Sequence, residues 1–273
     1  MSEARLNGKE EKLEEFFNAL KGARSSFLFL DYDGTLAPFR VDRFTARPWV
    51  GVRELLAEIQ KQGRTRMTMI TGRPAQEIRP LLGLEPPLEV WGLHGAERIY
   101  VDARRELEEA PAEAQAKLEE LREQLRQDSL GGLFEDKANG VVMHWRGEPA
   151  RKARLIEQRT RALFEPIARM DGLMVLDFEY GLELRAGRDK GGAVKAILEE
   201  AGASGPVAFL GDDLTDEAAF AVVNGLEGAH LSVLVRREPR ATVADVWLRP
   251  PGELLGFLSR WVDAGEKQKR RVD

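Results

Sequence analysis

Several features that define whole classes of protein are scarce or missing in this sequence. Cysteine is absent from the 273 residues, which excludes a disulfide framework, thiol chemistry and zinc sites built on cysteine. The three histidines lie far apart, so they make a poor zinc cluster. No apolar run approaches the length of a membrane span, and residues 1–12 are too polar and charged for a signal peptide. We therefore expect a cytoplasmic protein that has no membrane partner.

A strong excess of charge of one sign is also missing. The chain has 41 basic and 46 acidic side chains, a net charge of −5, which argues against nucleic acid as the main partner. An anionic substrate must therefore meet a local positive site. Hydrophobic residues make up 43% and charged residues 32%, proportions typical of a soluble globular protein. The length suits one large domain or two smaller ones, and we expect a monomer.

The most informative stretch of the sequence is an apolar run that ends in two carboxylates. Residues 27–30 predict a short strand buried on both faces, and Asp31 and Asp33 follow it. Ligands bind at the carboxyl ends of strands in an open α/β sheet, and two acids without an adjacent base favour a bound cation. A helix–loop–helix calcium site does not fit, because its sixth and twelfth residues would be Leu36 and Asp42. A plain surface turn stays an alternative.

Three later loops carry further polar groups at expected strand ends or helix starts. Thr71-Gly72-Arg73-Pro74 follows a strand expected at 65–70 and offers a hydroxyl, N–H groups and a positive charge to an anion. Taken alone, this loop favours an ordinary threonine-capped helix. Lys190 begins another helix, and an acidic loop after residue 210 contains Asp212, Asp213 and Asp216. Together, such carboxylates suit Mg²⁺, and the hydroxyl, N–H groups and lysine suit a phosphate.

Hydrophobic periodicity assigns most of the remaining chain to helices and strands. We expect helices at 10–21, 50–62, 112–127, 150–169, 190–200, up to about 223, and 252–262. We expect strands at 27–30, 65–70, 88–93, 133–137, 141–146, 173–178, 182–185, 206–210, 230–235 and 243–248. The tail from 266 onward is expected to be a frayed terminus. His94, between Gly92 and Gly95, is assigned to a backbone turn and given no chemical role.

The middle of the chain has a different pattern from its two ends. Asn139-Gly140 and Tyr180-Gly181 mark two hairpins, each preceded by a helix, which together form a module of about 85 residues. This predicts a small α+β domain, 102–186, inserted into an α/β domain of 1–101 and 187–273. The α/β domain is expected to contain a parallel sheet flanked by helices.

The polar loops resemble the four motifs of the haloacid dehalogenase-like superfamily of phosphotransferases. Asp31-Tyr32-Asp33-Gly34-Thr35-Leu36 is similar to the first motif, Thr71 to the second, Lys190 to the third, and Gly211-Asp212-Asp213 with Asp216 to the fourth. The resemblance extends to trehalose-6-phosphate phosphatases through Thr71-Gly72-Arg73, His94-Gly95-Ala96-Glu97, Glu135-x-Lys137, His144-Trp145-Arg146, Asp189-Lys190-Gly191 and the acidic loop to Glu217. It spans about residues 25 to 225.

The resemblance implies a Mg²⁺-dependent phosphatase that works through a phosphoaspartyl intermediate, the last step of trehalose biosynthesis. It makes Asp31 the nucleophile and Asp33 the acid and base, with Thr71 and Lys190 on the phosphate. It places the metal on Asp31, the Asp33 carbonyl and Asp212, with Asp213 or Asp216 in support. The inserted domain becomes a cap that selects the sugar. The implied substrate-binding residues are Arg73, Glu135, Lys137, His144, Arg146 and Glu183.

Three alternatives to this function stay open at the level of sequence. A capped phosphatase could act on another sugar phosphate, such as sucrose 6-phosphate or mannosyl-3-phosphoglycerate. A phospho-acceptor signalling module also uses Mg²⁺ and aspartates, but it needs no second acid at Asp33 and no cap. A catalytically inactive sugar-binding protein is disfavoured by the intact Asp31, Asp33, Lys190 and Asp212.

Overall fold

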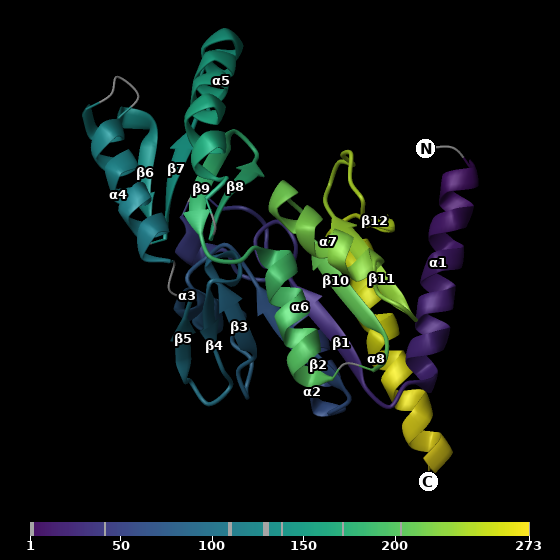
Figure 1. The fold of residues 1–273 in the computed structure, drawn as a ribbon. Coiled ribbons are helices and arrows are strands. Elements are labelled where there is room, and N and C mark those ends of the chain that lie inside the picture. The colour runs from purple at the N-terminus through teal and green to yellow at the C-terminus, as the bar shows by residue number, and fades with distance from the viewer. Residues whose placement is uncertain are drawn as a thin grey trace. The chain divides into compact units, whose positions relative to one another are not determined.

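The structure is a computed structural model that describes residues 3–40, 42–108, 111–127, 131–137, 139–170, 172–202 and 204–272, with side chains except in 3–7, 131 and 267–272. The chain forms two compact units (Figure 1): residues 1–106, 189–212 and 216–273 make the larger, and residues 107–188 with 213–215 the smaller. The functional division expected from the sequence, at 101/102 and 186/187, stays a prediction. No helix in the described ranges combines the length and apolarity that a membrane span needs.

The larger unit is built on an eight-stranded sheet with the order β12-β11-β10-β1-β2-β3-β4-β5. Neighbouring strands from β12 to β3 run parallel, and β4 runs antiparallel to β3. In chain order, the strands are β1 (Ser26–Leu30), β2 (Thr65–Ile70), β3 (Glu89–Gly92), β4 (Glu97–Ile99), β5 (Arg105–Leu107), β10 (Val207–Gly211), β11 (His230–Val235) and β12 (Val246–Leu248).

The central strand β1 shows how the sequence produces a sheet buried on both faces. Leu28 and Leu30 enter one hydrophobic cluster, whereas Phe27 and Phe29 enter another, because successive side chains of a strand point to opposite faces. The first cluster also takes residues from α1 (Glu3–Gly22), α2 (Val52–Lys61), α3 (Ala75–Leu82) and α8 (Gly252–Val272). The second takes residues from α6 (Lys190–Ala201) and α7 (Glu217–Asn224). The predicted sheet, mainly parallel and flanked by helices, is confirmed.

The smaller unit pairs two helices with a four-stranded antiparallel sheet of order β6-β7-β9-β8. Its elements are α4 (Ala112–Gln127), β6 (Phe134–Lys137), β7 (Gly140–His144), α5 (Ala150–Ile167), β8 (Leu173–Phe178) and β9 (Gly181–Ala186). Val141, Met143, Leu182 and Leu184 join the core of this unit with Leu118 of α4. The two predicted helix–hairpin repeats are therefore present.

Several elements differ from the sequence-based expectation. Helix α1 begins at Glu3 instead of 10. The charged strand β5 was not predicted, because Arg-Glu-Leu lacks the apolar pattern of a buried strand. Strand β12 begins at Val246 instead of 243, since the N–H of Val243 donates to Glu217 at 2.9 Å instead of pairing in the sheet. Helix α8 continues to Val272 past the expected end at 262, and its added residues are mostly strong helix formers.

Candidate active site

Three strands that lie side by side in the larger unit are each followed by a polar residue expected at the site. Strand β1 pairs with β2 on one side and with β10 on the other, all parallel. The residues that follow these strands are Asp31, Thr71 and Asp212. Because the carboxyl ends of parallel strands meet at one edge of a sheet, the side chains expected at strand ends converge there.

The turn after β1 requires a glycine for two reasons. Gly34 has a φ angle of +79°, which side chains other than that of glycine rarely adopt. A Cβ atom at this position would lie 2.0 Å from Oδ2 of Asp212. Gly34 thus lets the loops after β1 and β10 pack closely, and this contact brings the Asp212 carboxylate beside the first motif.

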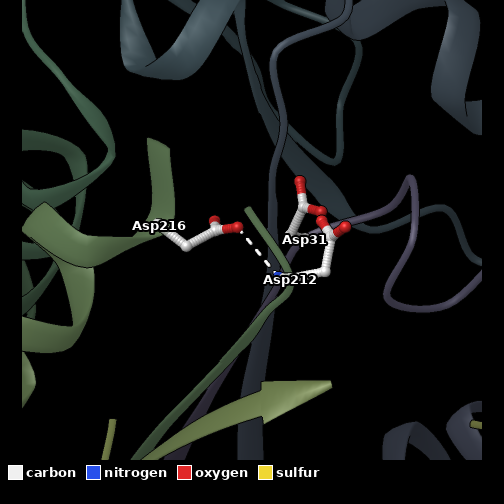
Figure 2. Close-up of side chains that lie close together, drawn as sticks. All are labelled: Asp31, Asp212 and Asp216. Atoms are coloured by element: carbon white, nitrogen blue, oxygen red, sulfur yellow. Dashed lines mark hydrogen bonds between the residues drawn. The ribbon is translucent and has the colours of Figure 1, made fainter. Parts of the chain in front are cut away.

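Asp31, Asp212 and Asp216 form a buried group of carboxylates (Figure 2). Each offers an oxygen, and these oxygens lie within 4.8 Å of one another. The Nζ atom of Lys190 donates to Oδ1 of Asp31 at 2.8 Å and to Oδ1 of Asp216 at 2.7 Å. The backbone N–H of Asp212 donates to Oδ2 of Asp216 at 3.0 Å, the dashed line in Figure 2. Asp216 is thereby fixed between the lysine and the loop after β10.

The charge of this group favours a bound cation. Burial raises the pKa of Asp31 from 3.8 to about 7; Lys190 opposes the rise, and Asp216 adds to it. Burial alone would lower the pKa of Lys190, but Asp216 and Asp31 raise it instead, so the lysine stays protonated. With every group ionised, three carboxylates (−3) and one ammonium (+1) leave a charge of −2. A divalent metal with oxygen ligands, such as Mg²⁺, fits this donor set and offsets its charge.

The loop after β2 holds the second acid of the first motif. Thr71 is buried, and its Oγ1 accepts from the N–H of Arg73 at 3.2 Å. The guanidinium of Arg73 donates to both carboxylate oxygens of Asp33, through Nε at 2.5 Å and through Nη2. Its Nη1 donates to the carbonyl of Arg43 at 2.6 Å. The sequence placed Arg73 among the substrate-binding residues, and in the structure this side chain orients Asp33.

Two of the five residues expected at the metal do not contribute a side chain to this group of carboxylates. The carboxylate of Asp33 pairs with Arg73. The backbone carbonyl of Asp33 is the metal ligand that the resemblance implied, and this pairing does not use it. The partly exposed Asp213 does not belong to the group of three carboxylates found among the described residues. Between Asp213 and Asp216, which the sequence left undecided, the geometry favours Asp216 as the supporting carboxylate.

The expected substrate-binding residues other than Arg73 lie on the smaller unit. Glu135, Val142 and Glu183 occupy one row across β6, β7 and β9, so their side chains share the face opposite the core residues of these strands. Lys137 Nζ donates to Glu183 at 3.0 Å, and His144 Nε2 lies 2.9 Å from Glu135. Arg146 stacks over the ring of Tyr180, 5.3 Å from its centre. In the structure, four of the expected substrate-binding residues therefore form two pairs: Lys137 with Glu183, and His144 with Glu135.

Three residues at the site have no role in the sequence-based assignment. Thr35 Oγ1 donates to Oδ2 of Asp31 at 3.2 Å, and its place in the first motif, four residues after Asp31, could have indicated this contact. Arg236 and Arg240 donate to the backbone carbonyl of Asp212 at 3.4 and 3.3 Å. Both arginines lie between β11 and β12, and no local pattern connects them with Asp212.

Comparison with known proteins identifies the family of this chain. The family described as Trehalose-phosphatase matches residues 29–246. A trehalose-phosphate phosphatase of Mycolicibacterium paratuberculosis is 30% identical over 260 residues, which cover 89% of this chain but only 64% of that relative, less than two thirds of its length.

Solved structures support the fold. The trehalose-6-phosphate phosphatase of Aspergillus fumigatus has a TM-score of 0.72 at 24% identity, covering 92% of this chain and 97% of that one. A haloacid dehalogenase-like hydrolase from B. subtilis has a TM-score of 0.61 at 16% identity, covering 85% and 98%. They confirm the haloacid dehalogenase-like fold, and the match to residues 29–246 shows that the chain belongs to the trehalose-phosphatase family.

Proposed function

We propose that this chain hydrolyses trehalose 6-phosphate to trehalose and phosphate, and that Asp31 carries the phosphoryl group between the two steps. The observation that carries the proposal is the position of the Asp31 carboxylate. This carboxylate is buried at the end of β1 and accepts hydrogen bonds from Lys190 and Thr35. It lies in the group of carboxylates with Asp212 and Asp216. The names of the relatives supply the sugar, and the family supplies the reaction class.

In the first half of the reaction, an oxygen of Asp31 attacks the phosphorus while the bond from phosphorus to the sugar oxygen breaks. Asp33, two residues on, gives its proton to the departing oxygen. In the second half, Asp33 takes a proton from water as the water oxygen attacks the phosphorus, and the bond to Asp31 breaks. The bidentate contact with Arg73 orients the ionised Asp33 carboxylate, the form that takes the proton from water.

Cations must balance the charge of a carboxylate that approaches a phosphate. Lys190, already bonded to Asp31, supplies one positive charge, and the Thr71 hydroxyl supplies a donor at the neighbouring strand end. Asp31, the Asp33 carbonyl and Asp212 would hold Mg²⁺, with Asp216 in support. When bound, the metal offsets the charge of the transferred phosphoryl group and of the carboxylates.

The smaller unit supplies the sugar specificity in this proposal and acts as the cap. Trehalose 6-phosphate presents many hydroxyl groups and no charge beyond its phosphate. Glu135, Lys137 and Glu183 offer acceptors and a donor on one face of the sheet, joined by His144, with Arg146 near Tyr180. Sucrose 6-phosphate and mannosyl-3-phosphoglycerate are the alternative substrates.

Release of inorganic phosphate from a panel of sugar phosphates tests this function. With Mg²⁺ present, kcat/KM for trehalose 6-phosphate should exceed the values for sucrose 6-phosphate and mannosyl-3-phosphoglycerate by at least about ten-fold. A higher value for either competitor would replace the proposed substrate. No release from any of them would remove the phosphatase function.

Light scattering of the purified chain tests the proposed monomer, and fractionation of the source cells tests the cytoplasmic location.

A further inference from the structure

The segment His94-Gly95-Ala96-Glu97 has no part in the reaction proposed above, yet the structure places it against the loop Thr71–Pro74. The segment follows β3, the strand next to β2 in the sheet. A Cβ atom on Gly72 would lie 2.6 Å from the His94 ring. The loop expected at the phosphate therefore packs directly on this turn.

Backbone hydrogen bonds join the turn to the loop at two points. The N–H of His94 donates to the carbonyl of Thr71 at 2.8 Å, and the N–H of Leu93 donates to the carbonyl of Arg73 at 2.9 Å. Leu93 and His94 both have positive φ angles, +48° and +57°, which side chains other than that of glycine rarely adopt. This unusual backbone aims the two N–H groups at the loop.

Glu97 makes a third connection through its side chain. Its carboxylate is fully buried, and Oε2 accepts from the N–H of Ala75 at 2.6 Å. Ala75 is the first residue of α3, and the preceding Pro74 offers no side-chain cap. Glu97, the first residue of β4, therefore caps the N-terminus of α3. Its negative charge lies at the positive end of the helix dipole, which is favourable. Its other oxygen, Oε1, accepts from Arg105 of β5 at 2.7 Å.

We propose that Glu97 is a positioning residue for phosphate binding. By fixing the first N–H of α3, Glu97 holds the loop that presents the Thr71 hydroxyl. The carboxylates expected at the metal lie after other strands, β1 and β10, so Glu97 governs the phosphate side of the site and not the metal side. This inference rests on the proposed function, because it takes Thr71 as a phosphate contact.

The chain offers a matched control in Glu89, a second buried glutamate. Glu89 lies on β3 and accepts from Arg66, Trp91 and Arg98, and none of these three donors belongs to the loop Thr71–Pro74. Glu89→Ala also removes a buried carboxylate but leaves the cap of α3 in place. Glu97→Gln is the conservative variant, since its amide oxygen can still accept from Ala75.

Titration calorimetry tests the assignment. The protein is titrated first with Mg²⁺ and then, once loaded with Mg²⁺, with inorganic phosphate. KM and kcat for trehalose 6-phosphate are measured on the same variants. Glu97→Ala should weaken phosphate binding and raise KM by about ten-fold or more, with Mg²⁺ affinity within about two-fold of wild type. Glu97→Gln should recover most of the phosphate affinity, and Glu89→Ala should keep it. If Glu97→Ala does not fold, Glu97→Asp, whose shorter side chain cannot reach Ala75, takes its place with the same expectation.

Unchanged phosphate affinity in Glu97→Ala or Glu97→Asp would overturn the assignment. An equal loss in Glu89→Ala would also overturn it, because the effect would then follow from general loss of packing. The proposed function fails differently: wild-type protein would not hydrolyse trehalose 6-phosphate at all, whatever the variants bind.

Discussion

Replacing Asp31 with asparagine should remove turnover and yet make the metal-free protein more stable at alkaline pH. An amide cannot serve as the nucleophile, so the reaction stops. The amide has almost the same shape as the carboxylate, and its oxygen can still accept from Lys190. The substitution therefore removes mainly one negative charge from a buried group of three carboxylates.

The size of the effect comes from the pKa of Asp31, which burial raises from 3.8 to about 7. Between these two pH values the folded state holds a proton that the unfolded state has released, so stability falls as pH rises and levels off above about 7. Each unit is worth about 1.36 kcal/mol, which gives a loss of about 3 kcal/mol between pH 5 and pH 7. The asparagine variant lacks this titration.

Urea unfolding with a chelator present, at pH 5 and pH 8, measures the difference between the two proteins. The free energy of unfolding of Asp31→Asn minus that of wild type should increase by about 3 kcal/mol over this range. Comparing the two proteins cancels the titration of carboxylates that lie far from Asp31. Parallel pH profiles would refute the reasoning, since they would mean that burial does not oppose the ionisation of Asp31. Added Mg²⁺ should reduce the difference in the free energy of unfolding at pH 8, because wild type should bind the metal more tightly than Asp31→Asn.

The remaining predictions concern the metal, the turn at Gly34 after β1, and the smaller unit. Chelation should abolish hydrolysis of trehalose 6-phosphate and Mg²⁺ should restore it, because three carboxylates converge there; activity that survives exhaustive chelation would contradict this. Gly34→Ala should lower the affinity for Mg²⁺ in calorimetry by at least about ten-fold, because its Cβ would collide with Asp212; unchanged affinity would show that the loop adapts. Glu183→Ala or Lys137→Ala should lower kcat/KM for trehalose 6-phosphate by about ten-fold or more and leave a small aryl phosphate unaffected, because hydroxyl partners are lost. Equal losses on both substrates would point to damaged folding instead.

Local patterns in the sequence were enough to predict most of the fold. The strands 65–70, 173–178 and 230–235 and the helix 112–127 coincide with their expected ranges, because each shows a clear hydrophobic period. The edge strand β5 was missed because its residues are exposed and carry no such pattern. The end of α8 was missed because a polar tail of helix formers was interpreted as a frayed terminus.

The candidate site was predictable where it follows strand ends and unpredictable where it depends on contacts between distant residues. Asp31, Thr71 and Asp212 follow three adjacent parallel strands, and this topology alone brings them together. The contact of Arg73 with Asp33 joins residues 40 positions apart, and that of Glu97 with Ala75 joins residues 22 positions apart. No periodicity reports such pairs, so only the three-dimensional structure identified their partners.

The phosphorylation state of Asp31 during turnover tests the central claim most directly. Mg²⁺-loaded protein would be mixed with trehalose 6-phosphate, quenched in acid within one turnover, digested and analysed by mass spectrometry. The account predicts one added phosphoryl group on the peptide that contains Asp31, no such group in Asp31→Asn, and no turnover in that variant. Hydrolysis without phosphorylation of Asp31, together with more than about a tenth of the wild-type rate in Asp31→Asn, a loss below about 1.4 kcal/mol, would contradict it in favour of direct attack by water.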